Sequence, residues 1–195
     1  MNDLDSFLRA IAPYGSRPPE TPALLRTAKS VELPRGHVLI RAGQPADWLG
    51  FLVRGLVRVF CLREDREVNL GFELEGAFVG DYAAYMQRGC AQHTLEALEP
   101  SRLLRFDRPL LDHLLAQHAG WREISGRIAE AELVRKLAKE VEIRTQSPEE
   151  RYAAMLASGS PLLQRVPLYH LASYLGITPE TLSRIRARRA KRARS

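Results

Sequence analysis

The sequence predicts an α+β chain with an antiparallel β jelly-roll domain, one long helix and a C-terminal all-α domain. Apolar and polar side chains alternate between frequent glycines from residue 37 to residue 106, which is typical of short strands in a barrel or double-sheet jelly roll. A helical apolar period follows at 121–144. Two short helical segments joined by a glycine turn end the pattern. The expected domains are 1–108, 109–145 and 146–195.

The charge is concentrated at the C-terminal end. The chain of 195 residues is 45% hydrophobic, as expected for a folded protein, and its net charge is +6. Residues 181–195 hold seven cations and no acid, which leaves 22 cations for the 23 acids of residues 1–180. The basicity therefore belongs to one short segment and not to the whole surface.

Several classes of protein are excluded. The longest stretch without a charged residue, 166–179, has 14 residues and a proline near each end, so it is too short to cross a bilayer of about 30 Å. The N-terminus has acids where a signal peptide needs cations. Cys61 and Cys90 form neither a CxxC pair nor a disulfide framework. We therefore expect a cytoplasmic protein without a membrane segment.

The first hundred residues predict a helical start and then strands. An apolar segment at 4–11 precedes a loop at 15–22, and a short helix and a turn are expected over 23–36. Arg63 to Arg66 form a charged connection suited to a β-hairpin. The segments with strand character are 37–43, 47–65, 66–76 and 93–106.

From Pro109 the period becomes helical, and the segment 121–144 predicts a helix about 36 Å long at 1.5 Å per residue. Its apolar stripe needs a partner, which is either the jelly roll of the same chain or the same helix of a second copy. Arg135 and Glu142 interrupt a strict heptad. The stripe consists of Ile124, Ile128, Ala131, Val134, Leu137 and Val141.

Three further helices are predicted near the C-terminus. Ser147 is an N-cap followed by Pro148, and residues 158–161 end that helix. Residues 168–175 then form a helix that stops at Gly176, and Thr178 caps the last helix. This arrangement is a helix-turn-helix, in which Ala172 is a small residue where the two helices must approach closely. The apolar inner face is formed by Leu171, Leu175, Ile177, Leu182 and Ile185.

The outer face of the last helix carries Glu180, Ser183 and Arg184. Arginine donates to guanine, glutamate accepts from cytosine N4 and serine contacts base edges, so these residues suit base reading in the major groove of DNA. The alternative is a solvated helical hairpin with a basic tail. The residues expected at DNA phosphates are Thr178, Thr181, Arg186, Arg188, Arg189, Lys191, Arg192 and Arg194.

The chain resembles the Crp/Fnr superfamily of bacterial transcription regulators. PRGHVLIRAGQPADWLGFLVRGLVRVF is similar to the first half of that family's cyclic-nucleotide-binding-like jelly roll, GAFVGD to its phosphate cassette, and ITPETLSRI to its recognition helix. The resemblance implies a non-enzymatic regulator that binds double-stranded DNA. It also implies a homodimer joined through 121–144 that reads TTGA-type half-sites, and it allows RNA polymerase as a further partner.

The cassette departs from that family. Members that bind cyclic AMP have a glutamate after the cassette glycine and an Arg-Ser or Arg-Thr pair further on. Here Asp81 follows Gly80, and Ala91 and Gln92 occupy the positions of the pair. Neither side chain can pair with a phosphate, so we expect that cyclic AMP does not bind. The alternative is a remodelled loop in which Arg88 takes the arginine's place.

No cofactor is predicted, and the effector is not identified by the sequence. The iron–sulfur branch needs an N-terminal cysteine cluster, whereas the first cysteine here is Cys61. Cys90 in the cassette is either a redox-active thiol or simply a small residue. The histidines, expected as surface or hydrogen-bonded residues and not as haem ligands, are His37, His93, His113, His118 and His170.

Two other classes of function compete with a DNA-binding regulator. A cupin-type metalloenzyme needs converging histidines, but no HxH pair exists. A ligand-binding module would use the helix-turn-helix for protein contacts. The sequence ends at RARRAKRARS, which resembles short family members that lack the two-stranded wing after the recognition helix.

Overall fold

The computed structural model describes the backbone of residues 3–192 and the side chains of residues 3–189. The chain divides into two compact units. One unit is made of residues 1–59 and 72–135, and the other is made of residues 60–71 and 136–195. No helix within the described residues is long and apolar enough to cross a membrane.

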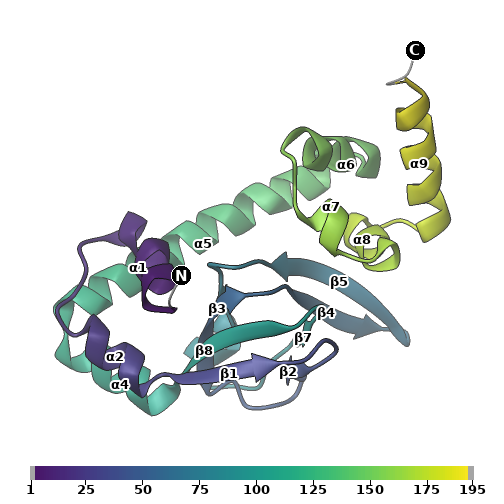
Figure 1. The fold of residues 1–195 in the computed structure, drawn as a ribbon. Helices are drawn as coiled ribbons and strands as arrows, with labels where there is room; N and C mark the ends of the chain where they lie inside the picture. The colour runs from purple at the N-terminus through teal and green to yellow at the C-terminus, as the bar shows by residue number, and fades with distance from the viewer. Residues whose placement is uncertain (1–2, 193–195) are drawn as a thin grey trace. The chain divides into compact units, whose positions relative to one another are not determined.

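The strands form two four-stranded sheets with antiparallel pairing (Figure 1). The strand orders are β1-β8-β3-β6 and β2-β7-β4-β5, which is the double-sheet arrangement of a jelly roll. The predicted α+β jelly-roll fold is confirmed. The strands are β1 (Lys29–Leu33), β2 (Val38–Ile40), β3 (Trp48–Arg54), β4 (Val57–Arg63), β5 (Arg66–Glu73), β6 (Phe78–Val79), β7 (Thr94–Ala97) and β8 (Ser101–Asp107).

The inner faces of the two sheets enclose one apolar core. Alternate residues of each strand point inward, so β3 contributes Trp48 and Leu52 to this core while Phe51 points to the other side. The core also includes Leu33, Ile40, Val57, Val79, Ala91, Leu95, Ala97 and Leu103.

A second core lies between the outer face of the β1-β8-β3-β6 sheet and the helices that cover it (Figure 1). Phe7 packs edge-on against Phe51, with ring centroids 5.2 Å apart. Leu24, Leu114, Trp121 and Ile124 complete the cluster from three other helices. The first half of the long helix is therefore fixed by a core of the same chain.

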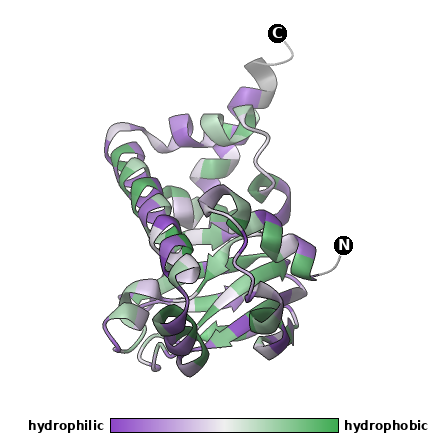
Figure 2. Ribbon diagram, turned by 90° about the vertical axis from the view of Figure 1, so that its left-hand side faces the viewer, coloured by the Kyte–Doolittle hydropathy of each residue, from purple (hydrophilic) through white to green (hydrophobic). Residues whose placement is uncertain are grey.

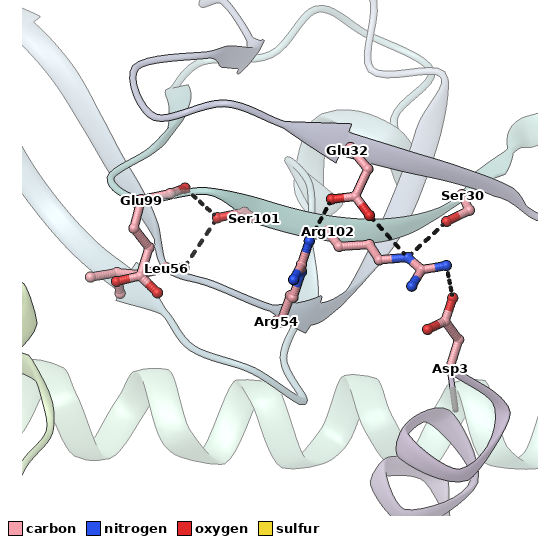
Figure 3. Close-up of polar contacts among 8 residues, drawn as sticks. All are labelled: Asp3, Ser30, Glu32, Arg54, Leu56, Glu99, Ser101 and Arg102. Atoms are coloured by element: carbon pink, nitrogen blue, oxygen red, sulfur yellow. Dashed lines mark hydrogen bonds and ion pairs between the residues drawn. The ribbon is translucent and has the colours of Figure 1, made fainter. Parts of the chain in front are cut away.

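The turn between β3 and β4 requires a glycine. Gly55 has a φ of +104°, and a Cβ there would lie 2.1 Å from the Ser101 hydroxyl oxygen. Ser101 itself accepts from the Leu56 N–H and donates to the Glu99 carbonyl (Figure 3). Beside this turn, the Arg102 guanidinium on β8 contacts Ser30, Glu32 and Asp3 (Figure 3). This network ties the N-terminal helix to the sheet.

The helices largely follow the predicted positions, with three differences. Residues 29–33 form strand β1, not the end of a helix and a turn, and the short helices α3 and α7 were not predicted. The helices are α1 (Asp3–Ile11), the 3-10 turn Ala12–Tyr14, α2 (Thr21–Thr27), α3 (Tyr82–Met86), α4 (Arg108–Gln117), α5 (Ala119–Thr145), α6 (Pro148–Ala157), α7 (Leu162–Arg165), α8 (Leu168–Leu175) and α9 (Pro179–Arg192).

The predicted hairpin and helix caps are confirmed. Glu64 and Asp65, between β4 and β5, both have positive φ, as a two-residue I′ turn requires. Ser147 and Glu150 form a reciprocal capping box at the start of α6. The Ser147 backbone N–H lowers the pKa of the Glu150 carboxyl.

Candidate nucleic-acid interface and ligand cassette

Helices α8 and α9 form the predicted helix-turn-helix. Gly176 ends α8 in the left-handed conformation, with a φ of 73°. Its N–H donates to the Ser173 carbonyl, and the Ile177 N–H donates to the Ala172 carbonyl, which together make a Schellman motif. The Thr178 hydroxyl accepts from the Thr181 N–H and so caps α9. These contacts set the direction in which α9 leaves the turn.

The inner faces of the two helices pack closely. Leu171, Ala172 and Leu175 on α8 are buried, as are Leu182 and Ile185 on α9. Ala172 has no exposed surface, as predicted for a small residue at a close helix crossing. The inner face predicted from the helical period is thus confirmed, apart from Ile177, which is half-buried.

Helix α6 supports the turn through a residue that the sequence did not single out. Arg151 is 7% exposed, and its Nη2 donates to the Leu175 carbonyl at 2.6 Å. This contact satisfies a carbonyl at the end of α8, next to Gly176. An arginine on a polar helix face gave no local signal, because its partner lies 24 residues away.

The predicted base-reading residues share one exposed face of α9. Glu180, Ser183 and Arg184 are all exposed. The Arg184 Nη2 donates to the Thr181 hydroxyl at 3.1 Å, and the Thr178 and Thr181 hydroxyls lie 3.2 Å apart. The Thr178 and Thr181 hydroxyls therefore hold the Arg184 guanidinium in place along one side of the helix.

The carboxylate of Glu180 is held at the start of the helix. The backbone N–H of Glu180 itself and the Thr178 hydroxyl lower the pKa of this carboxyl, and the Arg184 charge lowers it further. The side chain is therefore ionised at neutral pH and is an acceptor only, which is the form that a cytosine amino group requires.

The residues predicted at DNA phosphates are described only in part. Arg186 and Arg188 are exposed and Arg189 is half-buried. Arg188 pairs with Glu149 of α6 at 2.9 Å, so part of its charge is balanced within the chain. Helix α9 continues to Arg192, but the side chains of Lys191 and Arg192, and all of Arg194, lie outside the described residues.

In the ligand cassette, the Asp81 carboxylate is turned onto the cassette's own backbone. It accepts from the Ala84 N–H at 3.2 Å, where it caps α3, and from the Gln92 N–H at 2.9 Å. His93 Nδ1 lies 3.2 Å from the same carboxylate. Burial raises the pKa of Asp81, but these hydrogen bonds outweigh it and lower the pKa below its usual value. The carboxylate thus joins the two ends of the cassette.

The other cassette residues are placed as follows. Gly80 has a φ of +143° at the turn into α3. Ala91 is 3% exposed and belongs to the core between the sheets. Arg88 pairs with Asp112 of α4 at 2.9 Å, and its side chain is 69% exposed. In this arrangement Arg88 does not replace the arginine that cyclic-AMP-binding members of the Crp/Fnr superfamily have in the cassette.

The stripe on α5 differs from its prediction at the N-terminal end. Ile124 is 2% exposed and Ile128 packs against the same core, so assigning Ile124 to a dimer contact was wrong. Ala131 is half-buried. Further along the helix, apolar residues recur among polar ones (Figure 2). The exposed ones are Leu133, Val134, Leu137, Val141 and Ile143, with exposed fractions from 53% to 66%.

Three of the histidines are hydrogen-bonded or ion-paired. His93 meets Asp81, His118 lies 3.1 Å from Glu20, and His170 meets Asn69. Within the described part of the chain, no group of three or more histidine, cysteine or acidic side chains could hold a metal ion.

Comparisons with known proteins agree with this architecture. Residues 30–118 match the family model of the cyclic nucleotide-binding domain. No curated protein matches the chain. Among solved structures, FixK2 from Bradyrhizobium japonicum has a TM-score of 0.72 at 18% identity, covering 86% of each chain.

Two further structures are similar over most of their length. The c-di-GMP-responsive global regulator CLP from Xanthomonas campestris has a TM-score of 0.69 at 19% identity, with 87% of this chain and 89% of that chain covered. A putative transcriptional regulator of the Crp/Fnr family from Eubacterium rectale has a TM-score of 0.69 at 14% identity, with coverages of 87% and 82%. At these identities the likeness is one of fold.

Proposed function

We propose that this chain, which has the fold of a Crp/Fnr-type transcription regulator, binds double-stranded DNA sequence-specifically as a homodimer. The observation that carries the proposal is the exposed face of α9. Glu180, Ser183 and Arg184 lie together on a helix whose opposite face is buried in a helix-turn-helix. This face has the chemistry and the position of a recognition helix.

Each residue of that face has a separate task. Arg184 donates to guanine O6 and N7, Glu180 accepts from a cytosine amino group, and Ser183 contacts a base edge or a phosphate. The resemblance to the Crp/Fnr motif supports a TTGA-type half-site. The cations from Arg186 onward neutralise phosphates and give affinity without sequence information.

The dimer would form along the exposed stripe of α5. Apolar side chains that are more than half exposed at consecutive turns of one helix are unusual in a monomer. A second copy of the same helix would bury them and would bring two copies of α9 to one DNA molecule. Each copy would read one half of a pseudo-palindromic site.

The signal is a ligand or stimulus other than cyclic AMP. Three donors already occupy the Asp81 carboxylate, and the position of the phosphate-binding arginine is the buried methyl group of Ala91. Calorimetry with cyclic AMP should show no binding, and micromolar affinity would overturn this part of the proposal. A DNA-binding role implies the bacterial cytoplasm, where RNA polymerase is a further partner.

A salt series tests the proposal. The affinity for double-stranded DNA, measured by fluorescence anisotropy, should fall steeply and log-linearly with salt, because bound phosphates release counterions. If the helix-turn-helix instead serves protein contacts, DNA binding will be absent or will show no such slope. That result would favour a ligand-binding module in place of a regulator.

A further inference from the structure

Residues 60–71, which form most of the hairpin of β4 and β5, belong to the same compact unit as the helix-turn-helix. β5 is the last strand of its sheet, so one side of it has no neighbouring strand among the described residues. The free side of an edge strand presents N–H and C=O groups that can bind another segment. The backbone N–H and C=O groups of residues 67 and 69 point to the same side of β5, because alternate residues of a strand have the same orientation.

The Ser173 side chain of α8 forms hydrogen bonds with the backbone of both residues. Its hydroxyl oxygen accepts from the Asn69 N–H at 3.0 Å and donates to the Glu67 carbonyl at 3.2 Å. A hydroxyl has one donor and two acceptor sites, so one side chain can serve both backbone groups. The first helix of the helix-turn-helix is thus bound to the strand edge as a neighbouring strand would be.

A buried polar pair lies beside this contact. The Asn69 Nδ2 is 3.2 Å from His170 Nδ1, and the two residues are only 4% and 5% exposed. The two side chains therefore share one hydrogen bond, whose donor depends on the tautomer of the histidine ring. Polar groups are costly to bury unless they are paired, so this pair favours one position of α8 on the strand.

The DNA-reading face is open in this arrangement, because Glu180, Ser183 and Arg184 are exposed while α8 is bound to β5. We propose that Asn69, His170 and Ser173 are positioning residues, here named the hairpin clasp, which hold α8 and thereby orient the recognition helix before DNA arrives. The effect of the hairpin clasp on DNA binding rests on the proposed function, whereas the existence of the clasp does not. Orientation in advance raises affinity by lowering the ordering cost of binding.

The test uses the full chain with Ser173→Ala. Alanine is the best helix former, so α8 stays folded while the hydroxyl is removed. Hydrogen exchange of the Asn69 amide should accelerate about tenfold or more, because its hydrogen bond is gone. The dissociation constant for DNA should rise about three- to tenfold and equally for all sequences, because no base contact is removed.

Two variants complete the test. Ser158→Ala is the matched control, since the Ser158 hydroxyl donates to the Met155 carbonyl at the end of its own helix. Ser158→Ala should change neither the hydrogen exchange of the Asn69 amide nor the dissociation constant for DNA. Ser173→Thr keeps the hydroxyl and should restore both.

The outcomes separate the two proposals. Unchanged exchange at Asn69 in Ser173→Ala would show that the clasp does not form. Faster exchange with unchanged DNA affinity would show that the clasp forms but does not position α9, which overturns the inference. If the wild type binds no DNA, the proposed function fails, while the exchange experiment still decides whether the clasp exists.

Discussion

Asp81 illustrates how one carboxylate can change the use of a ligand cassette. It is 7% exposed and accepts from both ends of the loop that runs from α3 to β7. A glutamate in this position, one methylene longer, is expected to reach a bound ribose. The shorter side chain instead closes the cassette. The sequence showed only that Asp81 replaces a glutamate of the family, because its backbone partner at Gln92 lies eleven residues further along the chain.

The stability that Asp81 contributes should depend on pH. Because its pKa is lowered in the folded protein, the charged carboxylate stabilises the fold above the unfolded-state pKa of about 4. This contribution disappears as the pH falls through the folded-state value. Urea unfolding should show Asp81→Asn destabilised by about 0.5–2 kcal/mol at pH 7. The difference should shrink below pH 4 or so, and a difference independent of pH would contradict this assignment.

Arg184 should discriminate one base. Arg184→Ala should weaken binding to the preferred site by about 1–3 kcal/mol and abolish the preference for one guanine. The measurement is the affinity for that site and for copies with each guanine replaced. Arg186→Ala, which also removes an exposed arginine from α9, is the control and should weaken binding to all these sites alike. Retained selectivity in the Arg184 variant would refute the base-reading role.

At the scale of elements, local patterns predicted caps and turns well. Ser147, Thr178 and Gly176 act on neighbours within a few residues, so the sequence contains their whole signal. β1 was missed because its sequence KSVEL shows little alternation and only Leu33 is buried. It becomes a strand by pairing with β8, far away in the chain, through contacts such as Ser30 with Leu104.

The hairpin clasp could not be predicted from the sequence for the same reason. Asn69 and His170 are 101 residues apart. Neither residue type nor local spacing indicates that they meet. Their burial depends on the positions of the strand edge and of α8 in three dimensions, which no short stretch of the sequence contains.

The basic end of α9 should supply phosphate contacts. Truncation after Ala190 removes Lys191, Arg192 and Arg194. It should weaken binding to all DNA sequences alike, and the slope of log affinity against log salt should fall by about 0.9 for each phosphate that is no longer neutralised. The measurement is an anisotropy titration at several salt concentrations. An unchanged slope would show that these cations do not meet the backbone.

The exposed stripe of α5 should hold two subunits together. Leu137 is 54% exposed, so Leu137→Glu should leave the monomer folded and dissociate the dimer. Native mass spectrometry counts the subunits directly. Leu156→Glu, at an exposed leucine of α6, is the control and should remain dimeric. A wild-type monomer, or a dimer that survives Leu137→Glu, would exclude this seam.

At the scale of the whole molecule, the net charge of +6 is not spread over the chain. A body with 22 cations and 23 acids carries a C-terminal segment of seven cations that begins within the recognition helix. The fold was predictable because alternation, the long helical period and the glycine turn agree with one another. The dimer seam was predictable only in part, since nothing in the period distinguishes Ile124, which the subunit's own core buries.

The central claim is that two copies of this chain read a two-fold symmetric DNA sequence. Selection of binding sites from random double-stranded DNA with the full-length protein tests it most directly. We predict enriched sequences made of two inverted TTGA-type half-sites, whose centres lie about 34 Å apart, or one turn of the double helix. Recovery of no common sequence, or of a single half-site without its symmetry mate, would contradict the claim.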